Sequence, residues 1–400
     1  MHGVKSYTRY IVGILFLFCL RKGSSQIYCG TDAYFRENHL TNLAFPRHEL
    51  LETRGNIIIK VVVHIVYTNA DENLPDQLVR DQIAKLNIDF TNDSQDKPTI
   101  PKEFRSSVGS PFIRFCLTNQ DPAGKSSTGI IRKQAFIQNI GGKKDEKGKY
   151  IIHHSAAGGD DAWDTQEYLN IWVAPLDNIY GRSTIGGTTF DEAEDGIVID
   201  SKHFGYDPAK KLGGRTLTHE AGHYFGLRHL WGLSTGDCNE DDDISDTPPQ
   251  SGPYFDCPRY PQNSCDHSNM FMNYMDFTAD ECMDLFTKEQ SKRMIQILNS
   301  SRPGLLKKPT CQYPINSAFK IDAIKTYYNS KSGLMILQSS DLPDDPIQLM
   351  LSNSLGQFLY ATTLFTNPLL NLDLKDYPQG IYFLYFRYHN QQRIFKFLKP

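Results

Sequence analysis

The chain of 400 residues has no large excess of charge of either sign, since its net charge is only −4. Proteins that bind nucleic acid by bulk electrostatics need a basic surface, so this class of function is not expected. The sequence also lacks internal repeats and low-complexity tracts, and beyond its N-terminus it has no apolar run long enough to span a membrane. Its length instead favours two or three globular units.

One short apolar run lies near the N-terminus. Two basic residues precede IVGILFLFCL, and RKGSSQ follows it. This pattern predicts a secretory signal peptide over residues 1–25, cleaved after Ser25, because ten apolar residues are too few to cross a bilayer. The alternative is a lipoprotein anchor at Cys19, although Phe18 stands where such signals usually have a small residue.

The segments that follow have the order of an α/β domain. Residues 57–67, IIIKVVVHIVY, are a continuous β-branched run typical of a buried central strand. Residues 74–92 have apolar side chains at helical spacing, and PFIRFCLTNQ, YLNIWVAPL and DGIVID predict three more strands. Residues 233–274 lack periodicity and predict a long loop, before the amphipathic helix LFTKEQSKRMIQILNS. After Pro303, a linker and short alternating strands predict a small β-sandwich.

Histidine is scarce, with 12 in the whole chain, yet three fall within LTHEAGHYFGLRHLWG. On a helix, positions i and i+4 share a face, so His219 and His223 can hold one ion. Gly226 allows the chain to leave the helix sharply, so that His229 can supply a third nitrogen. Three histidines with one open position are typical of catalytic zinc.

Glu220 lies beside the first of these histidines, where its carboxylate can reach a water on the ion. The metal would acidify that water, and Glu220 would take its proton and pass it to the leaving amine. A chance match to HExxH is common, but a match to the full HExxHxxGxxH pattern is much rarer. A structural zinc would use four protein ligands, usually with cysteines, and no cysteine lies inside the motif.

HEAGHYFGLRHLWG, together with the later NYMDF, resembles the pappalysin branch of the metzincin metalloproteases. The resemblance covers roughly residues 55–300 and implies an α/β (α+β) metzincin domain with an active-site cleft. Relatives commonly read NYMDY, so Phe277 stands where a tyrosine can stabilise the oxyanion; either another donor serves, or zinc and the backbone suffice. The resemblance implies these site residues: His219, His223 and His229 on zinc, Glu220 as the base, and Met275 as the apolar floor below the metal.

Seven cysteines remain once the signal peptide is removed, an odd number. Four cysteines after the histidine motif allow three pairings, and the sequence alone does not choose between them. Cys116 and Cys311 are also present, and the sequence leaves open whether they form a disulfide with each other. The resemblance implies two interleaved bridges, Cys238–Cys265 and Cys257–Cys282.

Cys29, in YCGTD, lies upstream of the protease domain. A thiolate in a pro-segment can occupy the open zinc position and keep the precursor latent. The alternatives are a disulfide partner or an unused thiol. The odd number of cysteines and the similarity to pro-forms of the same branch favour a cysteine switch.

Two groups of acidic residues are candidate binding sites. In GDCNEDDDISDTP, Asp242, Asp243 and Asp246 are candidate ligands of a structural Ca2+, as the resemblance implies; a solvated acidic loop is the alternative. Similar enzymes have an acid below the pocket for the residue after the scissile bond. Glu281 occupies that position here, beside Asp280, which predicts a preference for Arg or Lys unless the two are merely solvated acids.

The C-terminal strands resemble the sorting domain read by the type IX secretion machinery of Gram-negative bacteria, whereas a substrate-binding sandwich is the alternative. The sequence thus predicts a secreted or cell-surface, monomeric zinc endopeptidase that acts on proteins and peptides. It would be made as a latent zymogen and activated by a cut at Thr53–Arg54. A surface-binding protein with an inactive protease domain is the rival, which the intact Glu220 disfavours. The expected domains are the signal peptide 1–25, the pro-segment 26–53, the protease 54–305, and the linker with the sorting domain 306–400.

Overall fold

The structure is a computed structural model, and the predicted signal peptide, the expected cut at Thr53–Arg54 and Cys311 lie outside the residues it describes. Among the described residues, no helix has the length and hydrophobicity needed to cross a membrane. The described residues are 29–37, 57–91, 99–188, 191–207, 213–307, 321–330, 332–338, 347–364, 369–388 and 391–400.

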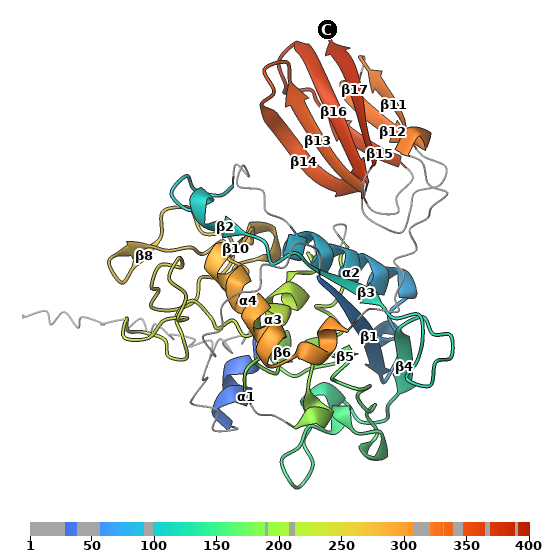
Figure 1. The fold of residues 1–400 in the computed structure, drawn as a ribbon, viewed down its shortest axis with the longest axis vertical. Coiled ribbons are helices and arrows are strands. Elements are labelled where there is room, and N and C mark those ends of the chain that lie inside the picture. The colour runs from blue at the N-terminus through green and yellow to red at the C-terminus, as the bar shows by residue number, and fades with distance from the viewer. Residues whose placement is uncertain are drawn as a thin grey trace, which may run out of the picture.

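A six-stranded sheet lies at the centre of the first domain (Figure 1). The strand order is β3-β1-β5-β7-β6, and β4 also pairs with β1. All pairs are parallel except β6 with β7, which are antiparallel, so β6 forms one edge of the sheet. The predicted central strand is confirmed as β1. The strands are β1 (Ile57–Tyr67), β3 (Ile113–Leu117), β4 (Ile130–Gln134), β5 (Leu169–Ala174), β6 (Gly181–Ser183) and β7 (Ile197–Asp200).

Helices cover one face of this sheet. Because side chains alternate along a strand, Val61, Val63 and Ile65 of β1 enter the core shared with the helices, whereas Val66 faces a second apolar cluster on the other side. Apolar side chains of three helices, such as Val79, Leu217 and Met294, belong to the same core as Val61, so these helices pack on one face of the sheet. The predicted α/β fold is therefore confirmed. The helices are α1 (Thr31–Glu37), α2 (Asp76–Thr91), α3 (Arg215–Tyr224) and α4 (Lys288–Ser300).

The long segment between α3 and α4 has little regular structure, as its lack of periodicity predicts. Among the described residues it contains the 3-10 helix Asp280–Cys282 and the short paired strands β8 (Asn263–Ser264) and β9 (His267–Ser268). Strand β10 (Phe286–Thr287), just before α4, pairs with β2 (Val108–Gly109). The structure has the disulfides Cys238–Cys265 and Cys257–Cys282, the same pairs that the family resemblance implies.

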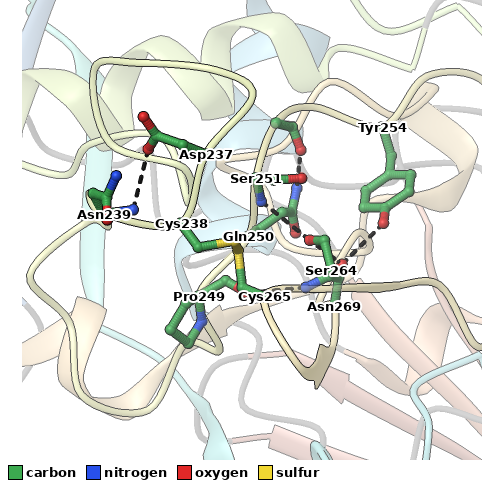
Figure 2. The surroundings of a disulfide bond; sticks show 11 residues. Asp237, Cys238, Asn239, Pro249, Gln250, Ser251, Tyr254, Ser264, Cys265 and Asn269 are labelled. Atoms are coloured by element: carbon green, nitrogen blue, oxygen red, sulfur yellow. Dashed lines mark hydrogen bonds between the residues drawn. A yellow bond between two sulfur atoms is a disulfide. The ribbon is translucent and has the colours of Figure 1, made fainter.

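Figure 2 shows how the first of these bridges is embedded. The Asn269 side chain accepts hydrogen bonds from the hydroxyls of Tyr254 (2.9 Å) and Ser264 (2.7 Å) and donates one to the carbonyl of Pro249 (3.0 Å). Asn269 is fully buried, so these bonds satisfy a polar group that would otherwise destabilise the loop. Cys116 is also disulfide-bonded, but whether it pairs with Cys311 stays open, since Cys311 is outside the described residues.

The C-terminal strands form a β-sandwich with its own apolar core, drawn in orange to red in Figure 1. One sheet has the order β11-β12-β15 and the other β14-β13-β16-β17, with antiparallel neighbours throughout. The predicted sandwich is therefore present. Its strands are β11 (Lys325–Asn329), β12 (Leu334–Gln338), β13 (Ile347–Asn353), β14 (Phe358–Leu364), β15 (Leu369–Asp373), β16 (Gly380–Tyr388) and β17 (Gln391–Lys399).

Candidate active site

Helix α3 carries the first part of the candidate site. His219 and His223 lie one turn apart on it and are buried at 4% and 0% exposure. The helix ends where Gly226 adopts a φ of +86°, and a Cβ at Gly226 would lie 2.5 Å from the Ile297 side chain. Glycine is therefore required there both by conformation and by space, and the sharp turn brings His229 back to the two helical histidines.

The three imidazoles point one nitrogen each at a common centre. Their Nε2 atoms are 3.1, 3.1 and 3.2 Å apart. The Nδ1 atoms of His219 and His223 donate to the backbone carbonyls of Tyr274 (2.7 Å) and Leu227 (2.9 Å), which can only accept. The Nδ1 of His229 donates to a carboxylate oxygen of Asp32 at 2.8 Å.

Because every Nδ1 carries the hydrogen, three Nε2 lone pairs converge with no proton between them. Burial lowers the pKa of His219 to about 3 and also lowers that of His223, which keeps these rings neutral and able to bind a cation. Three nitrogens about 2 Å from one zinc ion in tetrahedral geometry would lie roughly 3.3 Å apart, close to the observed separations. The donor set fits a zinc ion.

Cys29 supplies a fourth possible ligand. Its sulfur lies 3.5 Å from Nε2 of His223, and the four ligand atoms all lie within 4.8 Å of one another. Among the described cysteines it is the free one, and it is buried. Burial, followed by the charges of Glu220 and Asp32, raises the pKa of the Cys29 thiol well above its usual value. A thiolate at this place therefore needs a cation beside it.

Glu220 is fully buried next to the histidine cluster. One carboxylate oxygen accepts a hydrogen bond from the hydroxyl of Thr31 at 2.9 Å, and the other has no hydrogen-bond partner within the described part of the chain. Burial raises the pKa of Glu220 to about 8. Among the described residues, Glu220 therefore has one carboxylate oxygen without a hydrogen bond. If the Thr31 hydroxyl is displaced, the carboxylate can accept a proton from a small molecule bound in its place.

Met275 packs against helix α3, and Phe277 packs against the rings of His219 and His229. Met275 is fully buried, and a Cβ at Gly222 would lie 2.4 Å from its sulfur, so α3 and the methionine are in direct contact. The Phe277 ring meets the His229 ring edge to face at a centroid distance of 4.8 Å. Phe277 thus orients a histidine but has no group to donate to an oxyanion.

A pocket adjoins this cluster, and both predicted acids line it together with His219 and Glu220. Asp280 accepts a hydrogen bond from the backbone N–H of Arg215 at 3.2 Å, and burial raises the pKa of its carboxyl. Glu281 is exposed and makes no hydrogen bond or ion pair within the described residues. Of the two acids, Glu281 is the one available to a bound side chain.

Two of the three acids predicted to bind calcium make other contacts. Asp243 pairs with Arg228 at 2.9 Å, and Asp246 accepts hydrogen bonds from Thr287 and from the backbone of Glu289 at the start of α4. Asp242 is buried, and one of its oxygens has no partner among the described residues. The only group of three or more potential metal ligands found in the described segments is the cluster with Cys29.

The sequence did not predict a role in this site for Thr31 or Asp32. They follow Cys29 in CGTD and begin α1, which contacts the edge strand β6. The sequence did not predict strand β6 either, because its three residues are too few to show a periodic pattern. A β-bridge joins Cys29 to Gly181, and the N–H of Gly30 donates to the carbonyl of Gly181 at 2.8 Å.

Comparisons with known proteins agree with this geometry. Residues 155–299 match the Peptidase_M43 family, described as pregnancy-associated plasma protein-A. An extracellular metalloprotease of Arthroderma benhamiae is 40% identical over 284 residues, which cover 68% of this chain and 89% of that protein. A promirolysin mutant from Tannerella forsythia has 34% identity and a TM-score of 0.59, with 70% of this chain and 96% of that chain covered. Mature mirolysin, in complex with a cleaved peptide, has 38% identity and a TM-score of 0.56, with 63% and 95% covered.

Proposed function

This chain belongs to the pappalysin (Peptidase_M43) family of metalloendopeptidases, and we propose that it is a secreted enzyme whose catalytic zinc is bound by His219, His223 and His229. The observation that carries this proposal is the convergence of three Nε2 lone pairs, 3.1 to 3.2 Å apart. Secretion is supported by the predicted signal peptide and by relatives named extracellular metalloproteases.

Zinc in such a site polarises the scissile carbonyl and acidifies the attacking water. In the mature enzyme the Thr31 hydroxyl is gone, and the Glu220 carboxylate is free to accept the proton of that water. Glu220 then passes the proton to the departing amine. Phe277 gives no hydroxyl to the oxyanion, so oxyanion stabilisation is assigned to the metal and the backbone.

We infer that the chain is made as a latent zymogen in which Cys29 closes the metal site. The support is the position of its sulfur beside the three histidine nitrogens, at 3.5 Å from Nε2 of His223. At the same time, the Thr31 hydroxyl donates a hydrogen bond to the carboxylate of Glu220. Activation would require removal of the segment that carries both residues, and we propose a cut before Arg54, in a part of the chain outside the described residues.

The pocket beside Glu220 supports a preference for Arg or Lys directly after the scissile bond. Its lining includes Glu281, which has no competing hydrogen bond among the described residues, and Asp280. A carboxylate can bind a guanidinium through two parallel hydrogen bonds. The same preference would allow the enzyme to cut its own precursor between Thr53 and Arg54.

Three finer features are also proposed. The sandwich resembles a type IX sorting domain, so the protein would be exported through the periplasm of a Gram-negative bacterium. The acidic loop is proposed to bind a structural calcium, with the unpartnered oxygen of buried Asp242 as the support. The mature enzyme is expected to act as a monomer.

A cleavage profile of the mature enzyme on a peptide library, with and without a zinc chelator, tests this function. We expect cuts before Arg and Lys that stop with the chelator and return when zinc is added. Cleavage that continues after the metal has been removed would contradict the proposed centre. Chelator-sensitive cleavage without enrichment of basic residues would contradict only the pocket assignment.

Glu281→Gln should then lower kcat/KM for peptides with Arg after the scissile bond by about 10- to 100-fold, since hydrogen bonds to charged groups contribute about 1.5–3 kcal/mol. Peptides with Leu at that place should be cleaved nearly as before. The control is Glu192→Gln, because Glu192 is exposed and lies outside the pocket lining. An equal loss for both peptide classes would assign Glu281 a structural role instead.

A further inference from the structure

The three candidate metal ligands differ in what fixes their outer nitrogens. The protease domain itself holds His219 and His223, through the carbonyls of Tyr274 and Leu227. The outer nitrogen of His229 is held by the carboxylate of Asp32, which belongs to the pro-segment. No other partner of this nitrogen occurs among the described residues, so removal of the pro-segment removes its acceptor.

His229 is also positioned differently from the other two ligands. It lies on the chain after Gly226 rather than on α3, and its ring is held by apolar contacts. It stacks on Trp231 at a centroid distance of 4.6 Å and an interplanar angle of 11°, with Phe277 against it. These contacts set the plane of the ring. The bond to Asp32 sets which nitrogen carries the hydrogen and therefore directs the Nε2 lone pair to the centre.

Asp32 is placed by contacts that do not involve its own side chain. Its neighbour Thr31 donates to Glu220 and accepts from the backbone N–H of Ser183 at 3.0 Å. Further along α1, the Tyr34 hydroxyl donates to Glu194 at 3.3 Å. The Asp32 side chain is only 18% exposed, so its negative charge acts on His229 across a poorly solvated contact.

We propose that the pro-segment is a metal-retaining element as well as a lid, because Asp32 orients and polarises His229 and thereby strengthens zinc binding in the precursor. This inference rests on the proposed zinc site and adds a second function to the segment that carries Cys29. A carboxylate behind a histidine ligand makes the imidazole more basic, and loss of such a partner typically lowers metal affinity by about 10- to 100-fold. The precursor thus binds zinc more tightly than it would without Asp32.

Zinc affinity of the uncut precursor tests the role of Asp32. Glu220→Gln serves as the background, because it blocks self-cleavage while its amide oxygen can still accept from Thr31. Competition with a chromophoric chelator should give an affinity about 10- to 100-fold weaker for Asp32→Asn than for the parent. Glu37→Gln is the control and should bind zinc as the parent does, since Glu37 lies on the same helix but pairs with Lys144 on the surface.

Two comparisons separate this role from others. The weakening should persist when Asp32→Asn is combined with Cys29→Ala, because Asp32 acts through His229 and not through the thiolate. After the pro-segment has been cut off by added protease, parent and Asp32→Asn samples should bind zinc identically, since both then lack residue 32. Failure of the parent precursor to bind zinc would refute the proposed function itself. Tight zinc binding by Asp32→Asn, or an effect that disappears without Cys29, would overturn this inference alone.

Discussion

Glu220→Ala is expected to abolish most turnover while the protein keeps its zinc. General acid–base catalysis contributes on the order of 100- to 10,000-fold, and Glu220 is the buried carboxylate beside the metal-binding histidines. The histidines would be unaffected, because none of their outer nitrogens bonds to Glu220, and those of His219 and His223 bond to the backbone carbonyls of Tyr274 and Leu227. The loss should therefore appear in kcat rather than in metal content.

Emission spectroscopy for zinc and kcat for a peptide with Arg after the scissile bond would be measured on the same samples, after added protease has removed the pro-segment from each. His219→Ala is the comparison, since it should lose both zinc and activity. The precursor of Glu220→Ala should also stay uncut when purified alone. A Glu220→Ala enzyme that retains near-normal kcat would refute the assignment of the base.

Cys29→Ala is expected to make the uncut precursor active. The sulfur is the fourth atom of the cluster, and its removal leaves one position open to water and substrate. The contacts of Thr31 with Glu220 and of Asp32 with His229 remain, so opening is partial. We expect turnover by the precursor to rise at least about tenfold, which corresponds to ~1.4 kcal/mol less stability of the closed state.

Self-cleavage must be prevented for this comparison to be clear. Arg54→Ala in both proteins would remove the proposed cut site, and an intact mass would confirm that the precursor is whole. Added protease that removes the pro-segment should then bring both samples to the same activity. A Cys29→Ala precursor as latent as its parent would show that Thr31 and its neighbours, rather than the thiolate, close the site.

Much of the fold and the chemistry could be predicted from local patterns. The run at residues 57–67 is mostly β-branched, and it forms the central strand β1 because a strand covered on both faces accommodates such a run. The spacing of His219 and His223 is enough to place them on one face of a helix. Gly226 predicts the turn after it, since glycine adopts positive φ without strain.

Contacts between distant segments were harder to foresee. Thr31 and Asp32 act through bonds to residues 189 and 197 positions away, and no periodicity in the sequence records such pairs. The acidic loop shows the same limit, since a row of aspartates does not reveal that Asp243 pairs with Arg228 or that Asp246 bonds to the start of α4. Composition indicates a charge but not its partner.

X-ray absorption at the zinc edge of the intact precursor tests the central claim most directly. The account predicts one zinc with three nitrogen neighbours at about 2.0–2.1 Å and one sulfur neighbour at about 2.3 Å. In Cys29→Ala the sulfur shell should disappear while the three nitrogens remain. A precursor spectrum with no sulfur neighbour, or with fewer than three imidazole nitrogens, would contradict a zinc site formed by His219, His223 and His229 and closed by Cys29.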